Sequence, residues 1–119
     1  MSKQAFVVFS GPSELGKVFH ALTYAKQAKQ RGDQTELYFA GEGTHWPEIL
    51  SKPDHPVHGL FKEVQDMGII EGACQNCANA FGTSDSAQNT VGLVQGPEAS
   101  FGQIDVLGKE DQGYRVWTF

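Results

Sequence analysis

Short apolar runs alternate along this chain with segments of helical periodicity, and this alternation limits the fold to the α/β class. Residues 5–10 form a continuous apolar run that Gly11 and Pro12 end, a pattern typical of a strand buried on both faces. A helix follows, with Ser13 as its expected N-cap and Gly32 as its stop. The apolar residues of this helix recur at helical spacing: Leu15, Val18, Phe19, Leu22, Ala25 and Ala28.

The same patterns assign the rest of the chain. Strands are expected at residues 35–40, 69–73 and 114–119, helices at 45–50, 57–67 and 98–107, and a short strand or ordered loop at 90–94. This order predicts one domain over residues 1–119, a three-layer α/β/α sandwich around a mostly parallel sheet of about five strands, Rossmann-like or flavodoxin-like. The loops 11–13, 41–44 and 73–77 should meet at the carboxyl edge of that sheet, where ligands and reactive groups gather.

The only two cysteines, Cys74 and Cys77, stand three residues apart, directly after an apolar stretch. A buried strand is expected to pass there into a loop or a helix start, whose free N–H groups favour the nucleophilic thiolate. The alternative is a pair of reduced, buried thiols, because free cysteine is among the most buried residue types. The polar neighbours of the pair favour partial exposure instead: Gln75, Asn76 and Asn79.

Composition excludes several classes of function. The 119 residues are 39% hydrophobic and carry a net charge of -5, without a cluster of Lys and Arg that would follow a phosphate backbone. Direct nucleic-acid binding is therefore not expected. Neither a signal peptide nor an apolar run of roughly 20 residues is recognisable, so a cytoplasmic protein without a membrane segment is expected. In that reducing compartment a cysteine pair is more often catalytic or metal-binding than a structural disulfide.

Two motifs compete with thiol chemistry. The segment from Gly11 to Lys17 matches the spacing of a phosphate-binding loop, but Val18 replaces the residue that would hold magnesium, and Pro12 lacks an N–H donor. A turn that starts a helix is the better interpretation. The second motif is a set of four ligands for tetrahedral zinc, namely His55, His58, Cys74 and Cys77. Because the chain has enough apolar sequence for a core without a metal staple, no cofactor or metal is expected.

Several segments resemble the DsrE/DsrF-like family, which includes sulfur-relay proteins of tRNA thiolation. The opening strand with its Gly-Pro turn, the first helix and the loop that follows residues 36–40 are similar to that family. The segment from Cys74 to Gly82, with Thr83 and Asp85, resembles its active-cysteine segment, and residues 112–119 resemble its closing strand. The resemblance covers nearly the whole chain and implies the α/β sandwich described above.

The resemblance also implies roles for the two cysteines. In sulfur-relay members, the cysteine that corresponds to Cys74 accepts sulfane sulfur as a persulfide and passes it to the next protein. Cys77 departs from that family pattern, and as a neighbouring thiol it can attack a persulfide and release hydrogen sulfide. The basic residues that follow the cysteine in relay members are replaced here by Asn79, Ala80 and Phe81.

Three hypotheses follow from these observations. The first is a sulfurtransferase or persulfide carrier with Cys74 as acceptor and Cys77 as resolving or tuning thiol, which has donor and acceptor proteins as partners. The second is a dithiol redox or regulatory module, and the third is an oligomeric binding domain whose cysteines are incidental. The family also implies a homo-oligomer, a trimer or hexamer, with subunit contacts near Trp46, Phe101 and Trp117. Six aromatic residues fall at core-facing positions or strand ends, and core packing is expected for them: Tyr24, Tyr38, Phe39, Trp46, Phe61 and Trp117.

Overall fold

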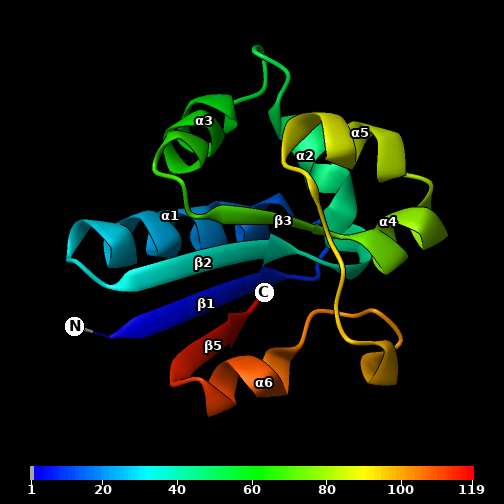
Figure 1. The fold of residues 1–119 in the computed structure, drawn as a ribbon. Helices are drawn as coiled ribbons and strands as arrows, with labels where there is room; N and C mark the ends of the chain where they lie inside the picture. Colours follow the sequence, from blue (N-terminus) through cyan, green and yellow to red (C-terminus); the bar gives the residue numbers. More distant parts are fainter. Residues whose placement is uncertain (1) are drawn as a thin grey trace.

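The structure is a computed structural model that describes residues 2–119, and its centre is one sheet of five parallel strands (Figure 1). The strand order is β4-β3-β2-β1-β5. The strands are β1 (Lys3–Val8), β2 (Gln34–Phe39), β3 (Ile70–Cys74), β4 (Leu93–Val94) and β5 (Tyr114–Thr118). The chain thus adds strands on one side of β1 and then returns to pair its last strand with the other side.

Helices connect these strands. They are α1 (Leu15–Gln30), the 3-10 helix η1 (Gly41–His45), α2 (Trp46–Leu50), α3 (His58–Asp66), α4 (Gln75–Phe81), α5 (Ser84–Thr90), the 3-10 helix η2 (Glu98–Ser100) and α6 (Val106–Asp111). Among the described helices, none is long and apolar enough to cross a membrane. The predicted α/β sandwich around a five-stranded parallel sheet is confirmed.

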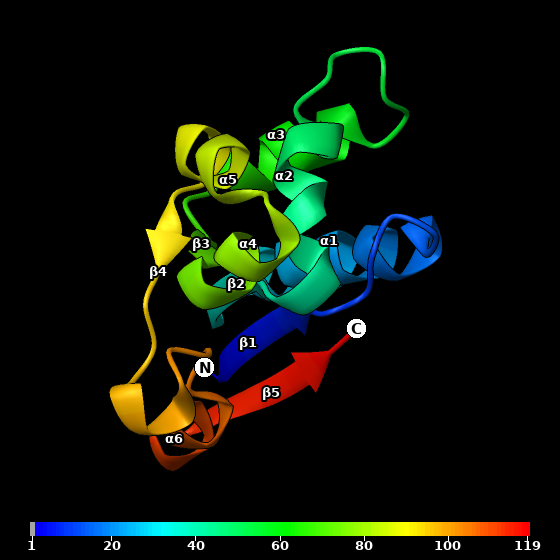
Figure 2. The same cartoon turned by 90° about the vertical axis from the view of Figure 1, so that its right-hand side faces the viewer.

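Alternate residues of each strand enter two different cores, because successive side chains point to opposite faces of a sheet. Phe6 and Val8 of β1 join the larger core, beneath α1, α2, α3 and α5. Val7 lies on the other face, in a smaller core with Tyr38 and Cys74. This second face is covered by the short helix α6 and the segment that precedes it (Figure 2). Cys74 therefore belongs to the thinner of the two outer layers.

Two local predictions are wrong, and one helix was missed. Glu14, not Ser13, occupies the N-cap of α1, and its side chain makes no capping hydrogen bond. The helix expected over residues 98–107 is broken, because Phe101 and Gly102 take positive φ angles of 57° and 76°, so α6 begins only at Val106. Helix α5 was not expected, since its Ser, Asn and Gln residues show no apolar periodicity and only Ala87 is buried.

A polar cluster fastens α6 to the sheet. Lys109 of α6 pairs with the Glu36 carboxylate of β2 at 2.7 Å, and both side chains are at most one fifth exposed. The Glu36 carboxylate also accepts hydrogen bonds from the hydroxyls of Tyr38, at 2.7 Å, and Tyr114, at 3.0 Å. Burial raises the pKa of Glu36, but these hydrogen bonds and the Lys109 charge outweigh it and hold the pKa below its ordinary value.

Lys109→Met is expected to lower the free energy of unfolding by about 1–2 kcal/mol at neutral pH, because Glu36 loses a charged partner in a partly screened site. A depressed carboxyl pKa stabilises the fold above the ordinary carboxyl pKa, and that stabilisation is lost as pH falls through the folded-state value. The difference between variant and wild type should therefore narrow from pH 7 to pH 4 in urea denaturation.

Lys26→Met is the matched control for this experiment. Lys26 pairs with Glu63 at 2.7 Å, but the Glu63 side chain is 48% exposed, so the loss should stay under about 1 kcal/mol. An equal effect of the two substitutions, or a Lys109→Met effect that does not change with pH, would contradict the stabilising role of the Glu36 cluster.

Candidate active site

The three loops expected at the carboxyl edge of the sheet are neighbours in the structure. The strands are in register there, with Val8 opposite Phe39 and Phe39 opposite Ala73. A Cβ atom on Gly11 would lie 3.0 Å from the side chain of Glu42, so the first two loops touch. The third segment, residues 73–77, comprises the end of β3 and the start of α4, and both elements contact η1, which contains the second loop. Just after α4, the Thr83 hydroxyl also donates to Thr44 of η1 at 2.9 Å. The predicted meeting of these segments is confirmed.

Cys74 is both the last residue of β3 and the N-cap of α4. Its Sγ accepts the backbone N–H of Cys77 at 3.4 Å, as expected for a sulfur at the start of a helix. The side chain is fully buried, against the expectation of partial exposure. Its Sγ lies 3.8 Å from the Gly102 carbonyl oxygen, on a segment that no local pattern placed near Cys74.

The electrostatic environment of Cys74 differs from the expected one. Burial raises the pKa of the Cys74 thiol, and the neighbouring thiol of Cys77 raises it further. The backbone N–H groups of Cys77 and Asn76 act in the opposite direction but do not prevail. Cys74 is thus a sheltered thiol that stays protonated at neutral pH until its surroundings change.

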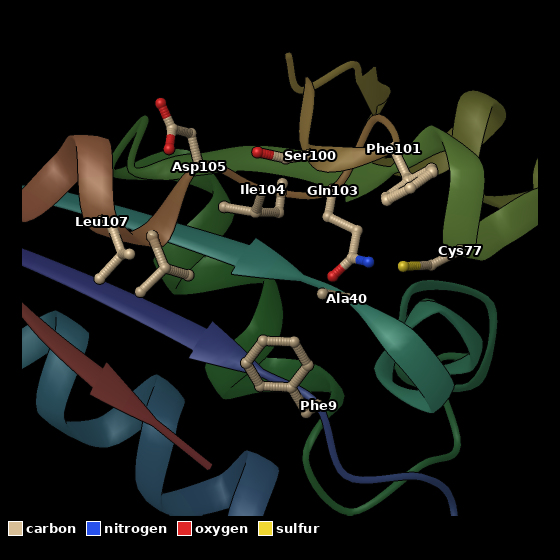
Figure 3. Close-up of a pocket in the computed structure, with 10 residues that line it drawn as sticks. Phe9, Ala40, Cys77, Ser100, Phe101, Gln103, Ile104, Asp105 and Leu107 are labelled. Carbon is tan, nitrogen blue, oxygen red and sulfur yellow. The ribbon is translucent and has the colours of Figure 1, made fainter. Parts of the chain in front are cut away.

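Cys77 occupies a different environment one turn into α4. Its side chain is half-buried and borders a cavity of about 370 Å³ at the carboxyl edge of the sheet. Figure 3 shows the Cys77 sulfur and the Gln103 side-chain amide pointing toward one another above Ala40, with Phe9 on the opposite side of the cavity. Both cysteines are free thiols. The pair therefore combines one sheltered thiol with one accessible thiol.

A turn of residues 96–103 covers Cys74. Its two arms are joined by the Gly96 N–H, which donates to the Gly102 carbonyl at 3.0 Å. The Asn76 side chain holds the turn to α4, because its amide donates to the Phe101 carbonyl at 2.8 Å. Phe101 adopts a left-handed conformation, rare for a bulky residue, with its side chain 80% exposed at the cavity. The cover consists of few contacts and can open locally.

Gly96→Ala should uncover Cys74. An alanine Cβ at this position would overlap the Gln103 carbonyl, so the two arms of the turn must separate. In a Cys77→Ser background, alkylation of Cys74 should accelerate about tenfold or more, since easing local opening by about 1.4 kcal/mol is sufficient. The rate is measured by mass spectrometry. Gly16→Ala is the control, because no atom lies within 4 Å of its new Cβ; equal rates in both variants would refute the covering role of the turn.

The competing motifs are not assembled as chemical sites. Among residues 2–119, no group of three or more His, Cys, Asp or Glu side chains could hold a metal ion, so the four suggested zinc ligands do not come together. His58 Nδ1 forms a hydrogen bond with the Leu50 carbonyl oxygen at 2.8 Å. His55 Nδ1 accepts a hydrogen bond from the Val57 N–H. The segment that resembles a phosphate loop is the turn into α1, where Lys17 pairs with Glu14.

The predicted aromatic positions are partly wrong. Tyr38, Phe39, Trp46 and Phe61 are buried as expected, so the Trp46 ring itself is not exposed. Tyr24 and Trp117, expected in the core, are each more than 40% exposed. Sequence reasoning also missed the cavity lining around Gln103 and Phe9. A usable signal was present, since Gly96 precedes the helix that was expected over residues 98–107 and Gly102 lies within it.

The protein is thus an α/β domain with an all-parallel sheet, and its candidate site is a cysteine pair at the carboxyl edge of that sheet. A family model matches residues 2–119, and the chain belongs to the DsrE/DsrF-like family. The chain is 26% identical, over 96% of its length and 93% of the relative's, to an uncharacterized protein of Methanocaldococcus jannaschii. A solved structure of a conserved protein of unknown function from Bacteroides thetaiotaomicron has the same fold, with a TM-score of 0.65 at 20% identity over 98% and 95% of the two chains. Family membership indicates a function of the sulfur-relay type.

Proposed function

We propose that this protein is a cytoplasmic sulfur carrier that holds sulfane sulfur as a persulfide on Cys74, with Cys77 as the resolving thiol. Its partners are proteins that donate and accept sulfur, and the single domain assembles into a homo-oligomer. The main support is the contrast between the two thiols at this helix start: Cys74 is fully buried, and Cys77, three residues later, borders a cavity. No metal or organic cofactor is needed, since displacement at sulfur requires only thiolates.

Burial of Cys74 suits storage rather than first attack. A persulfide is oxidised or reduced by any thiol or oxidant that reaches it, so shelter from solvent lengthens its lifetime. The Cys74 sulfur is enclosed by the smaller core and by the Gly102 carbonyl at 3.8 Å. The added sulfur would extend from Cys74 toward this cover, which must move when a partner thiol approaches.

Two discharge routes follow from the neighbouring thiol. An acceptor thiolate can attack the outer sulfur of the Cys74 persulfide, which forms a new persulfide on the acceptor and returns the Cys74 thiolate. Alternatively, the Cys77 thiolate attacks the Cys74 Sγ, which forms the intramolecular disulfide and expels hydrosulfide. The second route leaves an oxidised pair, and a dithiol reductant must then restore both thiols.

Intact-protein mass spectrometry after incubation with a small-molecule persulfide tests the proposal. One added sulfur atom, an increase of about 32 Da that a thiol reductant removes, is the expected result. A protein that gains no sulfur and only loses two hydrogens, about 2 Da, would contradict the carrier function. That result would instead favour the dithiol redox module, which the Cys-x-x-Cys spacing also allows.

The oligomer in this proposal would use exposed aromatic residues. Trp117, Tyr24 and Phe119 line a second hollow of about 630 Å³ between the edge strand β5 and α1. β5 leaves one edge of the sheet unpaired, which is a surface that a further copy can cover. Analytical ultracentrifugation of wild type and Trp117→Glu tests this part, and a monomeric wild type would contradict it.

A further inference from the structure

The cavity at the carboxyl edge reaches only one of the two thiols. Its lining includes Cys77 but not Cys74, whose side chain is fully buried beneath it. A donor that approaches through this opening therefore meets the sulfur of Cys77 first (Figure 3). The opening also lies between the strand ends of β1 and β2, next to the point where the chain changes its side of the sheet, where ligands of such folds bind.

The lining of the cavity has a distinct chemistry. Most of its surface is apolar, contributed by Phe9, Ala40, Phe101, Ile104, Val106 and Leu107. Asp105 is the only charged residue among the ten that line the cavity, and none of them is Lys, Arg or His. The Asp105 carboxylate is held in place as the cap of α6, because it accepts the Gly108 N–H at 3.1 Å. The cavity thus offers no counter-ion to an anionic donor.

We propose that this cavity binds the sulfur donor, that the donor is a hydropersulfide with apolar surroundings and no charge beyond its reacting sulfur, and that sulfur passes from it to Cys77 and then to Cys74. This inference rests on the proposed carrier function and assigns its donor class and its route. A cavity of about 370 Å³ is large enough for a small molecule or for one persulfidated side chain of a partner protein.

Both transfers conserve atoms and electrons. The Cys77 thiolate attacks the terminal sulfur of the donor R–S–SH, a new S–S bond forms on Cys77, and R–S⁻ departs and takes up a proton. After Cys74 loses its proton to solvent or to the departing thiolate, its thiolate attacks the terminal sulfur of Cys77–S–SH. That step forms Cys74–S–SH and returns the Cys77 thiolate. The sulfane sulfur keeps its oxidation level throughout, so no oxidant or reductant is consumed.

The Cys77 thiol is close enough for the second transfer. The two cysteines stand three residues apart at the same helix start, and the Cys77 N–H donates to Cys74 Sγ at 3.4 Å. The Gln103 amide, which points toward the Cys77 sulfur, can donate to the charge that develops there (Figure 3). A direct attack by Cys74 on an external donor would require the cover at Gly102 to open first.

The test compares two donors that differ only in remote charge: the persulfides of N-acetylcysteine, which carries a carboxylate, and of N-acetylcysteine amide, which does not. Wild type should load Cys74 about three- to fivefold faster from the amide, because the cavity lining contains the Asp105 carboxylate and no cation to offset its repulsion of the anion. Cys77→Ser should slow loading from both donors at least about tenfold, because only cover opening then exposes Cys74. A Cys77→Ser protein that loads at the wild-type rate would overturn the route.

A lysine introduced at the cavity rim tests whether charge in the cavity determines the preference between the two donors. Leu107 is 74% exposed at the rim, and Leu107→Lys should remove or reverse the preference for the amide. Leu15→Lys, on a leucine outside the lining, should leave the preference as in wild type. An equal preference between the two donors in Leu107→Lys and Leu15→Lys would overturn the assignment of this cavity as the donor site. If no protein acquires sulfur from either donor, the carrier function itself fails.

A third donor shows whether the sulfur comes from a protein or from a small molecule. It is a short peptide with leucines on both sides of a persulfidated cysteine. Saturation at a lower concentration than the amide assigns the donor to a protein segment that also covers Phe101 and Leu107. Saturation at the same concentration assigns it to a small molecule. Failure of the peptide and the amide to load a protein that the anionic donor does load would overturn the donor class.

Discussion

Trp46→Ala is expected to lower the free energy of unfolding by about 3–5 kcal/mol, the largest stability change that a single side chain of this protein should cause. Trp46 is 1% exposed in the larger core, at the start of α2. Its indole N–H donates to the Ser10 carbonyl at 2.8 Å, so the ring joins α2 to the loop after β1. Its removal leaves a large cavity and an unpaired carbonyl group.

The same substitution at Trp117 is the matched control. Trp117 stacks on Phe6 with ring centroids 6.5 Å apart and donates to Gln4, but it is 43% exposed. Its loss should therefore cost only about 1–2 kcal/mol. Urea denaturation of both variants measures the difference. Comparable losses at the two positions would contradict the placement of Trp46 in the core.

The effect of Trp46→Ala should extend to the cysteines. α2 follows η1 directly, and Thr44 of η1 accepts a hydrogen bond from the hydroxyl of Thr83, which connects α4 to α5. A loosened η1 removes a support of α4, so alkylation of Cys74 should accelerate in the variant even under conditions where it stays folded. Unchanged alkylation would show that the core and the thiol site are not coupled.

Cys74→Ser should abolish the stable persulfide, a reduction of at least about tenfold in retained sulfur, because the only sheltered thiol is lost. Sulfur that reaches Cys77 in this variant remains at the open cavity, where a second thiol removes it. Cys77→Ser is the matched variant, one turn away on the same helix. It should fill slowly but hold its sulfur longer than wild type, since the resolving thiol is gone.

The readout is the fraction of protein that carries the added sulfur, followed over time after the donor is removed. The two serine variants separate the roles of the thiols because each retains one of them. Equal retention in Cys74→Ser and Cys77→Ser would contradict the assignment of storage to Cys74. A raised Cys74 pKa also predicts that loading of Cys77→Ser rises with pH beyond the ordinary thiol range.

Local sequence patterns were sufficient for the sheet and for the position of the pair. The apolar run before Cys74 indicates a buried strand, and the polar residues after it indicate a helix start, so the cysteine was expected at the junction where it lies. The chemical state of Cys74 could not be predicted in this way. Its burial depends on Gly102, 28 residues further along the chain, and no local pattern relates the two.

The error over residues 98–107 explains why the cavity was missed. A helix was expected over residues 98–107, but Phe101 and Gly102 both take left-handed conformations that end any helix there. The resulting turn, rather than a helix, forms the wall next to Cys77. Trp46 is a related case, because a tryptophan beside a loop is compatible with either a core or an interface, and only its tertiary contacts decide.

The most direct test of sulfur storage on Cys74 is to locate the added sulfur in wild-type protein. After brief incubation with the neutral persulfide, free thiols and persulfides are alkylated, and the peptide that contains both cysteines is fragmented between residues 74 and 77 by mass spectrometry. The carrier mechanism predicts the extra sulfur on Cys74 at equilibrium, preceded by a transient fraction on Cys77. Sulfur that remains on Cys77 alone at all times, or that is found on neither residue, would contradict it.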